Sequence, residues 1–372
     1  MKLLISTELY TPSTGGQELR YTEMAEALVA RGHEVSVLCI RHAADLPPRE
    51  IRNGVKVFRY PFSPNYQRPR IKAMRRRFWS LLRFAVWSRS MMQHLEHDIV
   101  IFNQWPLAHV VLASRADRRV GVLDWCEVRH SRLFSFIQRL LPRLTQGNIA
   151  VSSAVQEHMA SVSGRAIGYI PSGVHCSRYR SRPREERRDV VYLGRLAEHK
   201  NLPFLIAAFD ILKQRGYPHG LKIAGSGPSM ETVRGHIADS PNASCISLLG
   251  RVSDEEKVAL LSTCEVLAIP SQREGFPRVV AEAMASGLPT VTAAYPGNGT
   301  AAVVREYECG EVCSDAPHDM AIKIESVLVN WMTYSRAALE RSQELDWRNV
   351  LPHVEALATR AESPVVVDAR TS

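Results

Sequence analysis

Two glutamates, Glu274 and Glu282, are separated by seven residues and stand on either side of a helix start signal. Pro277 suits a first helical turn, and Gly287 suits the position just after a helix ends. The pattern therefore predicts one short helix that carries Glu282, about two turns after Glu274. Glu274 is then expected in the loop just before this helix.

The start of this short helix could hold a phosphate group. The free backbone N–H groups of about Arg278 and Val279 would point at an anion placed above them. Carboxylates suit pairs of hydroxyls, so Glu274 and Glu282 could bind the sugar and the ribose of one ligand. The alternative is that one glutamate caps the helix and the other lies on its surface.

A second candidate site follows the apolar segment 190–193, which is expected to be a buried strand. Arg195 and Lys200 come directly after this segment, close enough in the chain to reach one anion together. Arginine offers a planar fork of donors and lysine a point charge, so the pair suits a diphosphate. The alternative is a solvated basic loop.

A glycine-rich turn, Gly225-Ser226-Gly227-Pro228, follows a third apolar segment, 221–224. Glycine lets the backbone come close to a ligand, although a plain tight turn would use the same residues. Met230 stands where a dinucleotide-binding motif needs its third glycine, which argues against NAD.

These loops need a parallel sheet to bring them together, because ligands bind beyond the carboxyl ends of parallel strands. The N-terminal sequence predicts such a sheet: strand 2–6, a loop with Gly15 and Gly16, helix 18–30 and strand 33–40. Gly32 stands where a helix C-cap glycine is expected. One βαβ unit is thus predicted at the start of the chain.

Similar αβ alternation continues along the chain and predicts an α/β fold with two domains, which suits a length of 372 residues. We expect an N-terminal domain over 1–170, a linker over 171–189 that is rich in charge, a C-terminal domain over 190–335, and a helical segment over 336–372 that crosses back to the first domain. Further strands are expected at 98–102, 120–123, 148–151, 190–193, 221–224, 246–248, 266–270 and 289–292.

The composition favours a folded cytoplasmic enzyme. Seven cysteines form an odd, scattered set, which fits reduced thiols, and they show no zinc-ligand spacing. The apolar run at 1–5 is too short for a signal peptide, and no run is long enough to span a membrane. The net charge of +9 lies in the first half of the chain.

The motifs together resemble the retaining glycosyltransferases of family 4 (group 1), which have the GT-B fold. The similarity is carried by the two glutamates with Gly275-Phe276 and by the segment Glu282 to Pro289. Other segments match in the same order along nearly the whole chain: Gly15-Gly16, Ala30 to Val35, Ile170 to Val174, Gly194 to Leu196, Lys200-Asn201, Gly225 to Pro228 and Leu249 to Val252. The resemblance implies two Rossmann-like, doubly wound domains facing across a cleft.

The resemblance also implies a role for each matched residue. Arg195 and Lys200 would bind the diphosphate of a nucleotide-sugar donor, Glu274 its sugar, and Glu282 its ribose. Other donor contacts would come from Gly16, Gly225, Gly227, Arg251, Val252, Gly275, Phe276, Arg278 and Val279, with the base next to Arg251 and Val252. Such enzymes are similar in needing no metal ion, since cations and helix amides take its place.

The chain departs from this family where a histidine commonly follows a strand of the first domain and faces the sugar. Asp124 stands nearest that position, so we expect it to be catalytic, with Glu127 and His130 as alternatives. Asn103 follows another expected strand. It is predicted, with Gly15 and Asp124, on the acceptor side.

A strongly basic stretch lies between Glu50 and Glu96, where eleven lysines or arginines occur without an acidic residue. Aromatic residues alternate with the cations over 68–92. A helix here would have an apolar and a cationic face, which suits peripheral contact with an anionic membrane at its inner face or with an anionic acceptor. The alternatives are an ordinary amphipathic surface helix and a nucleic-acid contact.

The sequence therefore predicts a retaining, metal-independent glycosyltransferase without a cofactor. It would move a sugar from a nucleotide-diphosphate donor to a glycan, a lipid-linked or a small-molecule acceptor. Two alternatives remain open: a sugar-nucleotide hydrolase or epimerase on the same fold, and a basic nucleic-acid-binding protein.

Overall fold

A computed structural model of the chain describes residues 1–13, 15–63, 78–113, 120–129 and 131–359. The chain divides into two compact units, which are treated one at a time below. The first unit contains Met1–Gly173 and Trp347–Ser372, and the second contains Val174–Asp346. Within the described residues, no helix combines the length and the apolar character that crossing a bilayer requires.

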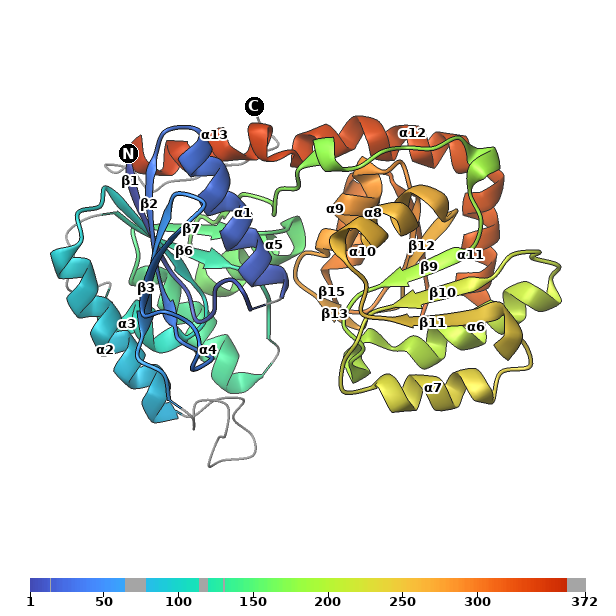
Figure 1. Ribbon diagram of the computed structural model, residues 1–372, viewed down its shortest axis with the longest axis horizontal. Coiled ribbons are helices and arrows are strands. Elements are labelled where there is room, and N and C mark those ends of the chain that lie inside the picture. The colour runs from blue at the N-terminus through green and yellow to red at the C-terminus, as the bar shows by residue number, and fades with distance from the viewer. Residues whose placement is uncertain (14, 64–77, 114–119, 130, 360–372) are drawn as a thin grey trace. The chain divides into compact units, whose positions relative to one another are not determined.

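The first unit is built on an eight-stranded sheet with the order β3-β4-β2-β1-β5-β6-β7-β8 (Figure 1). All neighbours are parallel except β3 and β4, which form an antiparallel pair at one edge. Its strands are β1 (Lys2–Ser6), β2 (Glu34–Ile40), β3 (Arg49–Arg52), β4 (Val55–Tyr60), β5 (Ile99–Asn103), β6 (Val120–Trp125), β7 (Gly147–Ala150) and β8 (Gly168–Tyr169). Seven strands therefore have their carboxyl ends at one edge.

Helices cover both faces of this sheet because its strands are apolar on both sides. They are α1 (Gly16–Ala30), α2 (Phe78–His94), α3 (Leu107–Ala113), α4 (Arg132–Leu140), α5 (Ser153–Ser163) and α13 (Trp347–Thr359). One core cluster joins α1 and α13 to Leu3 and Ile5 of β1, and a second joins α2, α3 and α5 to the opposite side through Leu4. Alternate residues of one strand thus serve two cores.

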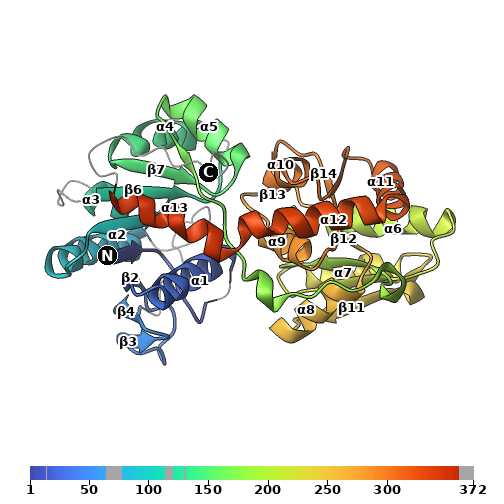
Figure 2. The same ribbon diagram turned by 90° about the horizontal axis from the view of Figure 1, so that it is seen from above.

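The C-terminal helix α13 belongs to this first unit although 173 residues separate it from the rest (Figure 2). Trp347 is buried, and its Nε1 donates to Glu23 Oε2 of α1 over 2.8 Å. The expected boundaries differ from this division. Residues 174–189, expected to be a linker, lie in the second unit, and so do residues 336–346, expected to start the returning segment.

The second unit has a six-stranded, all-parallel sheet with the order β11-β10-β9-β12-β14-β16. Its strands are β9 (Val190–Leu193), β10 (Leu221–Ala224), β11 (Ile246–Gly250), β12 (Val266–Ile269), β14 (Thr290–Ala293) and β16 (Gly310–Cys313). A separate two-stranded sheet pairs β13 (Arg273–Glu274) with β15 (Gly297–Asn298). The α/β architecture with parallel sheets in two domains is as predicted.

The helices of the second unit pack around one large core that includes residues of every strand of its main sheet. They are α6 (Leu202–Gln214), α7 (Met230–Ala238), α8 (Asp254–Thr263), α9 (Arg278–Ala285), α10 (Gly299–Glu306), α11 (Pro317–Val329) and α12 (Trp331–Ser342). The short helix predicted between Pro277 and Gly287 is α9. It is buried along nearly its whole length, as its apolar sequence requires.

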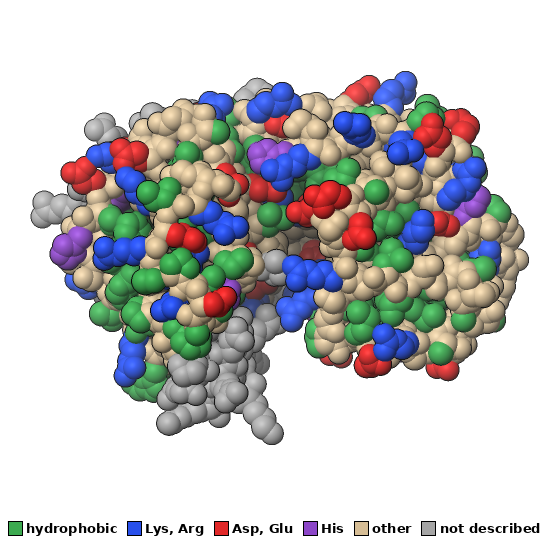
Figure 3. All heavy atoms as spheres, viewed as in Figure 1, with side chains coloured by type: hydrophobic (Ala, Val, Ile, Leu, Met, Phe, Trp, Pro, Cys, Tyr) green, Lys and Arg blue, Asp and Glu red, His purple; other side chains and the backbone are tan. Residues whose placement is uncertain are grey.

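The predicted basic helix over 71–92 is described only from Phe78 onward, as α2; residues 64–77 lie outside the described part of the chain. On the face seen in Figure 3, cationic, anionic and apolar side chains are interspersed. All seven cysteines are free thiols.

Candidate functional site

Three loops of the second unit leave neighbouring strands at the same edge of the sheet. They follow β10, β9 and β12, which are adjacent in that order. Because these strands are parallel, the loops 225–228, 194–201 and 270–277 all lie beyond their carboxyl ends. The structure thus brings the three predicted segments of this unit to one edge.

The closest contact between two of these loops joins Lys200 to Glu274. Lys200 Nζ donates to Glu274 Oε1, and Ser271 Oγ donates to the same oxygen over 3.1 Å. The two charged side chains are only 15% and 19% exposed, so both are held in place yet still reach the surface. A cation and a carboxylate are therefore positioned together by the protein's own contacts.

The side chain of Arg195 is exposed, and its backbone carbonyl is held by a hydrogen bond. The hydroxyl of Tyr192 donates to the Arg195 carbonyl over 3.1 Å. Burial raises the pKa of Tyr192, and the nearby negative charge of Glu274 raises it further, so this hydroxyl stays protonated and keeps donating. Tyr192 is a positioning residue that the sequence did not single out.

Gly225 and Gly227 fit a structural role inside the loop cluster. A Cβ on Gly225 would lie 1.8 Å from the carbonyl oxygen of Gly194, and one on Gly227 would lie 2.1 Å from that of Leu196. The backbones also exchange hydrogen bonds, since Leu196 N–H donates to the Ser226 carbonyl over 3.0 Å. The missing side chains therefore let the β10 loop support the loop that carries Arg195.

The loop with Glu274 and Gly275 is fixed from the other side by the β13–β15 pair. Gly299, at the start of α10, approaches so closely that a Cβ there would lie 2.3 Å from the Gly275 carbonyl oxygen. Asn298 caps α10 by accepting from Thr300 N–H over 3.1 Å. The short strands β13 and β15 pair here because the start of α10 packs directly against the Glu274 loop.

Helix α9 presents its N-terminus at the same edge. It begins at Arg278, and no side chain caps it among the described residues. Val280 N–H donates to the Pro277 carbonyl over 2.8 Å. The amides of Arg278 and Val279, in the first turn, are the ones that were predicted to meet an anion. Phe276 packs against the core just before this turn.

Glu282 lies on α9 and is 4% exposed. Its Oε1 accepts from Lys257 Nζ of α8 over 3.1 Å, and Lys257 also lies 3.4 Å from Asp254. A buried carboxylate needs such a partner, because leaving its charge unpaired would be costly. Lys257 is a second residue that the sequence analysis missed; its spacing in the chain from Glu282 gave no signal.

Arg251 and Val252 follow β11, on the far side of β10 from β9. Arg251 is exposed, and Val252 is half-buried against the core. Gly250, just before them, has a left-handed φ of 70° and accepts through its carbonyl from Gly225 N–H over 2.7 Å. The predicted base-binding segment therefore adjoins the glycine-rich loop.

In the first unit, Asp124 does not face a surface. It is 0% exposed, and its Oδ2 accepts from Arg20 Nε and from the Tyr21 hydroxyl, each over 3.0 Å. Arg20 also donates to the carbonyls of Ile170 and Pro171. The predicted catalytic carboxylate is thus engaged in a buried ion pair that fastens α1 to the sheet.

Glu127 and His130 are the predicted alternatives to Asp124. Glu127 is half-buried; its Oε1 accepts from Trp105 Nε1 over 3.0 Å and from Arg129 Nε over 3.1 Å. Arg129 in turn stacks over the Trp105 ring at 4.4 Å. His130 lies outside the described residues.

Asn103 pairs with Asp124 in the register of β5 and β6. It is 2% exposed, and its Nδ2 donates to Thr7 Oγ1 and Gln17 Oε1 over 3.0 Å each. Its amide is therefore occupied by these two partners. Gln17 belongs to α1, so Asn103 supports the helix start rather than standing free for an acceptor.

Gly15 and Gly16 lie where α1 begins, as expected from the first βαβ unit. Gly15 is extended and offers no side-chain cap, and a Cβ there would lie 2.2 Å from Glu18 Oε2. At Gly16 no atom of the described residues lies within 4 Å of an added Cβ. The backbone of this turn is thus open to a ligand at Gly16.

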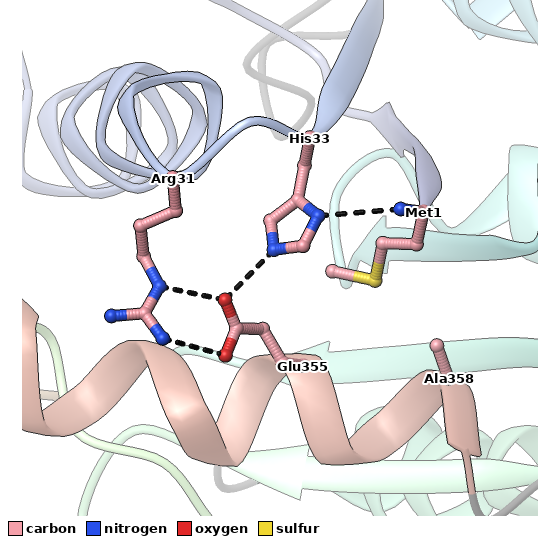
Figure 4. Close-up of a pocket in the computed structure, with 5 residues that line it drawn as sticks. All are labelled: Met1, Arg31, His33, Glu355 and Ala358. Carbon is pink, nitrogen blue, oxygen red and sulfur yellow. Dashed lines mark hydrogen bonds and ion pairs between the residues drawn. The ribbon is translucent and has the colours of Figure 1, made fainter.

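A shallow hollow in the first unit is lined by none of these residues. Its lining is Met1, Arg31, His33, Glu355 and Ala358 (Figure 4). Arg31 binds both oxygens of Glu355, over 2.7 and 2.9 Å, and this hydrogen bonding lowers the pKa of Glu355. Because these groups fasten α13 to α1, the hollow belongs to a helix contact and contains no predicted site residue.

The arrangement at the second unit's edge can bind a phosphorylated ligand. Lys200, Arg195 and the α9 amides provide positive charge, and Glu274 and Glu282 provide acceptors for hydroxyls. No group of three or more His, Cys, Asp or Glu side chains able to hold a metal occurs in the part of the chain that the structure describes.

Two protein families match successive halves of the chain. Residues 14–178 match the family described as Glycosyltransferase Family 4, and residues 177–343 match Glycosyl transferases group 1. Together they leave only the ends of the chain unmatched.

Two curated relatives match most of the sequence. The glycogen synthase of Mycobacterium tuberculosis is 25% identical over 94% of this chain and 92% of its own length. The GDP-mannose-dependent alpha-(1-6)-phosphatidylinositol monomannoside mannosyltransferase of the same organism is 26% identical over 78% of this chain and 80% of its own.

Solved structures match the fold over nearly the whole chain. Sucrose-phosphate synthase from Thermosynechococcus elongatus gives a TM-score of 0.82 at 18% identity, covering 96% of this chain and 98% of that one. HepE from Anabaena, solved with UDP and glucose, gives 0.71 at 19% identity and covers 96% and 100%.

Proposed function

Because the chain belongs to the group 1 glycosyltransferases of family 4, with the GT-B fold, we propose that it transfers its sugar with retention at the anomeric carbon and without a metal ion. The family acts with nucleotide-sugar donors, and the acceptor proposed here is a hydroxyl of a glycan, a lipid-linked or a small molecule. The observation that supports this proposal best is the contact of Lys200 and Ser271 with one oxygen of Glu274.

In the proposed reaction, the bond between the sugar's anomeric carbon and the donor phosphate breaks. Lys200 and Arg195 neutralise the charge that develops on the departing diphosphate, together with the amides at the start of α9. The acceptor hydroxyl forms the new bond and gives its proton to an oxygen of the leaving phosphate. Lys200 Nζ exchanges its contact with Glu274 for a contact with the donor phosphate. Glu274 can then accept hydrogen bonds from the sugar hydroxyls.

Glu282 would bind the two ribose hydroxyls of the nucleotide. Its pairing with Lys257 leaves the second carboxylate oxygen as an acceptor on the same side chain. A nucleoside diphosphate should therefore lie with its phosphates over α9 and its base near Arg251 and Val252. HepE was solved with UDP, and the mannosyltransferase relative is named for GDP-mannose, so the base is to be found by experiment.

The test is calorimetric titration of the full chain with UDP, GDP, dTDP and ADP. One nucleotide should bind with micromolar affinity, and Lys200→Ala and Glu282→Ala should each weaken it at least tenfold. Glu231→Ala, a change at a side chain that is 80% exposed on α7, is the matched control and should bind as the unchanged protein does. Failure of every nucleotide to bind would contradict the proposed donor site.

Stereochemistry and metal dependence need separate tests once the donor is known. The anomeric proton of the product, followed by NMR from the first minutes, should keep the donor's configuration. Activity should survive EDTA. An inverted product would contradict retention, and release of free sugar at an equal rate without acceptor would favour the hydrolase alternative.

Peripheral membrane contact is a further part of this proposal, and α2 supports it. Trp79 and Val86 are 60% and 56% exposed on this helix, and Arg83 and Arg89 are exposed beside them. Apolar and cationic side chains on one exposed helix suit an anionic bilayer surface. Sedimentation with phosphatidylglycerol vesicles should fall on Trp79→Ala; equal sedimentation with phosphatidylcholine vesicles would contradict the charge contribution.

A further inference from the structure

A carboxylate and a guanidinium lie together beyond the carboxyl ends of two neighbouring strands of the first unit. Glu127 and Arg129 follow the end of β6, and Trp105 follows the end of β5. Because β5 and β6 are parallel, these side chains belong to the edge at which open sheets bind ligands. The side chains of Glu127 and Arg129 are 25% and 27% exposed, so a molecule in solvent can reach both.

The carboxylate of Glu127 is held through only one of its two oxygens. Oε1 accepts from Trp105 Nε1 over 3.0 Å and from Arg129 Nε over 3.1 Å, and Arg129 Nη2 lies 3.0 Å from the same oxygen. The Glu127 N–H donates to Oε1 of buried Gln104 over 2.9 Å, which fixes the backbone as well. Oε2 has no hydrogen-bond partner among the described residues, yet it is not buried. It is therefore an acceptor that is open to solvent and fixed in direction.

The guanidinium of Arg129 is fixed by two half-buried aromatic rings. Its Cζ lies 4.4 Å from the centroid of the Trp105 ring and 5.2 Å from that of Phe134 on α4. The two rings meet edge to face, with their centroids 5.7 Å apart. Nε and Nη2 face Glu127, whereas Nη1 is not buried and has no partner in the part of the chain that the structure describes. The ion pair thus offers a ligand one acceptor and one donor.

This combination of groups suits a neutral sugar better than an anion. A hydroxyl both donates and accepts, so the hydroxyls of one sugar ring can donate to Glu127 Oε2 and accept from Arg129 Nη1. The two charges of the ion pair cancel, and the open carboxylate oxygen would repel a phosphate placed against it. Aromatic rings beside a few fixed polar groups are the usual lining of a small-molecule site. The cluster therefore favours an uncharged ring with several hydroxyls.

We infer that Glu127 and Arg129 bind an uncharged sugar ring of the acceptor through its hydroxyls, and that Trp105 positions the carboxylate for this contact. This inference rests on the proposed function, and it narrows the acceptor to a carbohydrate. A carboxylate that is fixed before the ligand arrives loses less entropy on binding. Asp124, which was expected to serve this side of the site, is 0% exposed and offers no such open oxygen.

The experiment observes the indole N–H of Trp105 in the full chain, because this group donates to Glu127. The protein is labelled with ¹⁵N, and the Trp105 signal is assigned by its loss in Trp105→Phe. The sugar probes are the methyl α-glycosides of glucose, mannose and galactose. Cyclohexanol, a ring with a single hydroxyl, and inorganic phosphate are the comparison probes.

At least one glycoside should shift the Trp105 signal saturably at millimolar concentration, whereas cyclohexanol and inorganic phosphate should not shift it. Glu127→Gln should weaken the sugar response at least tenfold, because the ion pair that fixes the carboxylate is lost. Glu96→Gln, at a side chain that is 79% exposed, is the matched control and should leave the response unchanged. Unaltered indole signals of buried Trp125 and Trp347 show that the first unit of each variant folds.

Three results would overturn the inference: a Trp105 signal that responds to no glycoside, a response that Glu127→Gln leaves intact, or tighter binding of inorganic phosphate than of the glycosides. The proposed function fails separately, in the nucleotide titration of the unchanged protein. A sugar response without nucleotide binding would keep this subsite and remove the transferase donor site. Nucleotide binding without a sugar response would keep the donor site and remove the subsite.

Discussion

His109 is a buried histidine whose hydrogen bonds require one protonation state. It is 0% exposed; its Nε2 donates to the Asn103 carbonyl over 2.7 Å, and its Nδ1 accepts from Ser6 Oγ over 2.9 Å. Burial lowers the pKa of His109 to about 4. The neutral ring, on α3, therefore links the end of β1 to Asn103 at the end of β5.

This pKa makes the stability of the first unit depend on pH. Between the unfolded value of 6.5 and the folded value of about 4, the unfolded chain binds more protons, so stability is lost as pH falls. At pH 4.5 the loss from His109 should be about 2.5 kcal/mol. His109→Gln should show a correspondingly smaller loss between pH 7.5 and 4.5 in urea unfolding.

Tryptophan fluorescence suits this measurement, because Trp331 alone of the six tryptophans belongs to the second unit. The comparison of the two proteins at each pH removes the effect of other titrating groups. An equal loss in His109→Gln and in the unchanged protein would show that His109 does not carry the pH dependence.

Gly227 tests the structural role of the glycine-rich turn. Gly227→Ala places a Cβ 2.1 Å from the Leu196 carbonyl, where backbone must move. We expect a loss of about 2 kcal/mol in the second unit and weaker nucleotide binding, because the loop with Arg195 shifts. Gly235→Ala on α7, with nothing within 4 Å, is the control and should be neutral or stabilising. Equal behaviour of the two variants would contradict this account.

At the scale of elements, the docking of α13 on the first unit depends on Trp347. Its ring is 1% exposed, and a Cβ on Gly173 would lie 2.4 Å from it, so the glycine makes room for the ring. Trp347→Ala should cost about 3 to 5 kcal/mol and release α13 first. Hydrogen exchange of the α13 amides should rise strongly, whereas Met332→Ala, 69% exposed on α12, should change nothing. Unchanged α13 protection would contradict the anchor role.

The ion pair of Arg31 with Glu355 contributes less to this docking (Figure 4). Its side chains are 42% and 24% exposed, and exposed pairs contribute at most about 1 kcal/mol. Hydrogen bonding to Arg31 lowers the pKa of Glu355, so its share is present above the unfolded value of 4.5 and lost as pH falls below it.

The elements that sequence analysis located best are the central strands. β1, β9 and β10 have the predicted bounds, because strands buried on both faces are continuous apolar runs between turn residues. The strands that were not predicted are β3, β4, β8, β13, β15 and β16. All of them except β4 are pieces of two to four residues, too short to give a clear apolar pattern. β3 and β4 pair with each other across a tight turn at the edge of the sheet, where polar side chains alternate with apolar ones.

The site was predictable where chemistry follows a strand. Lys200 and Glu274 lie together because β9 and β12 are neighbours, which the motif order implied. The burial of Asp124 could not be foreseen, since its partners Arg20 and Tyr21 are about a hundred residues away in the chain. A polar residue after a strand looks the same in sequence whether it faces solvent or an arginine.

At the scale of the whole molecule, the second unit is an insertion in the first. The chain enters it at Val174 and leaves it at Asp346, and Val174 N–H donates to the Leu345 carbonyl over 2.8 Å. The first unit is completed only when Trp347 packs against Gly173. Each unit is thus closed by contacts between its own two ends, and two chain crossings connect them.

This organisation predicts that a nucleotide stabilises the units unequally. Nearly all proposed donor contacts belong to the second unit; Gly16 is the exception. A nucleoside diphosphate at 100 times its dissociation constant should stabilise the second unit by about 2.7 kcal/mol. Hydrogen exchange should therefore slow in β9, β10 and β12 and change little in β5 and β6. Glu282→Ala should reduce the slowing at the same nucleotide concentration. Slower exchange confined to the first unit would contradict the assignment of the donor to the second.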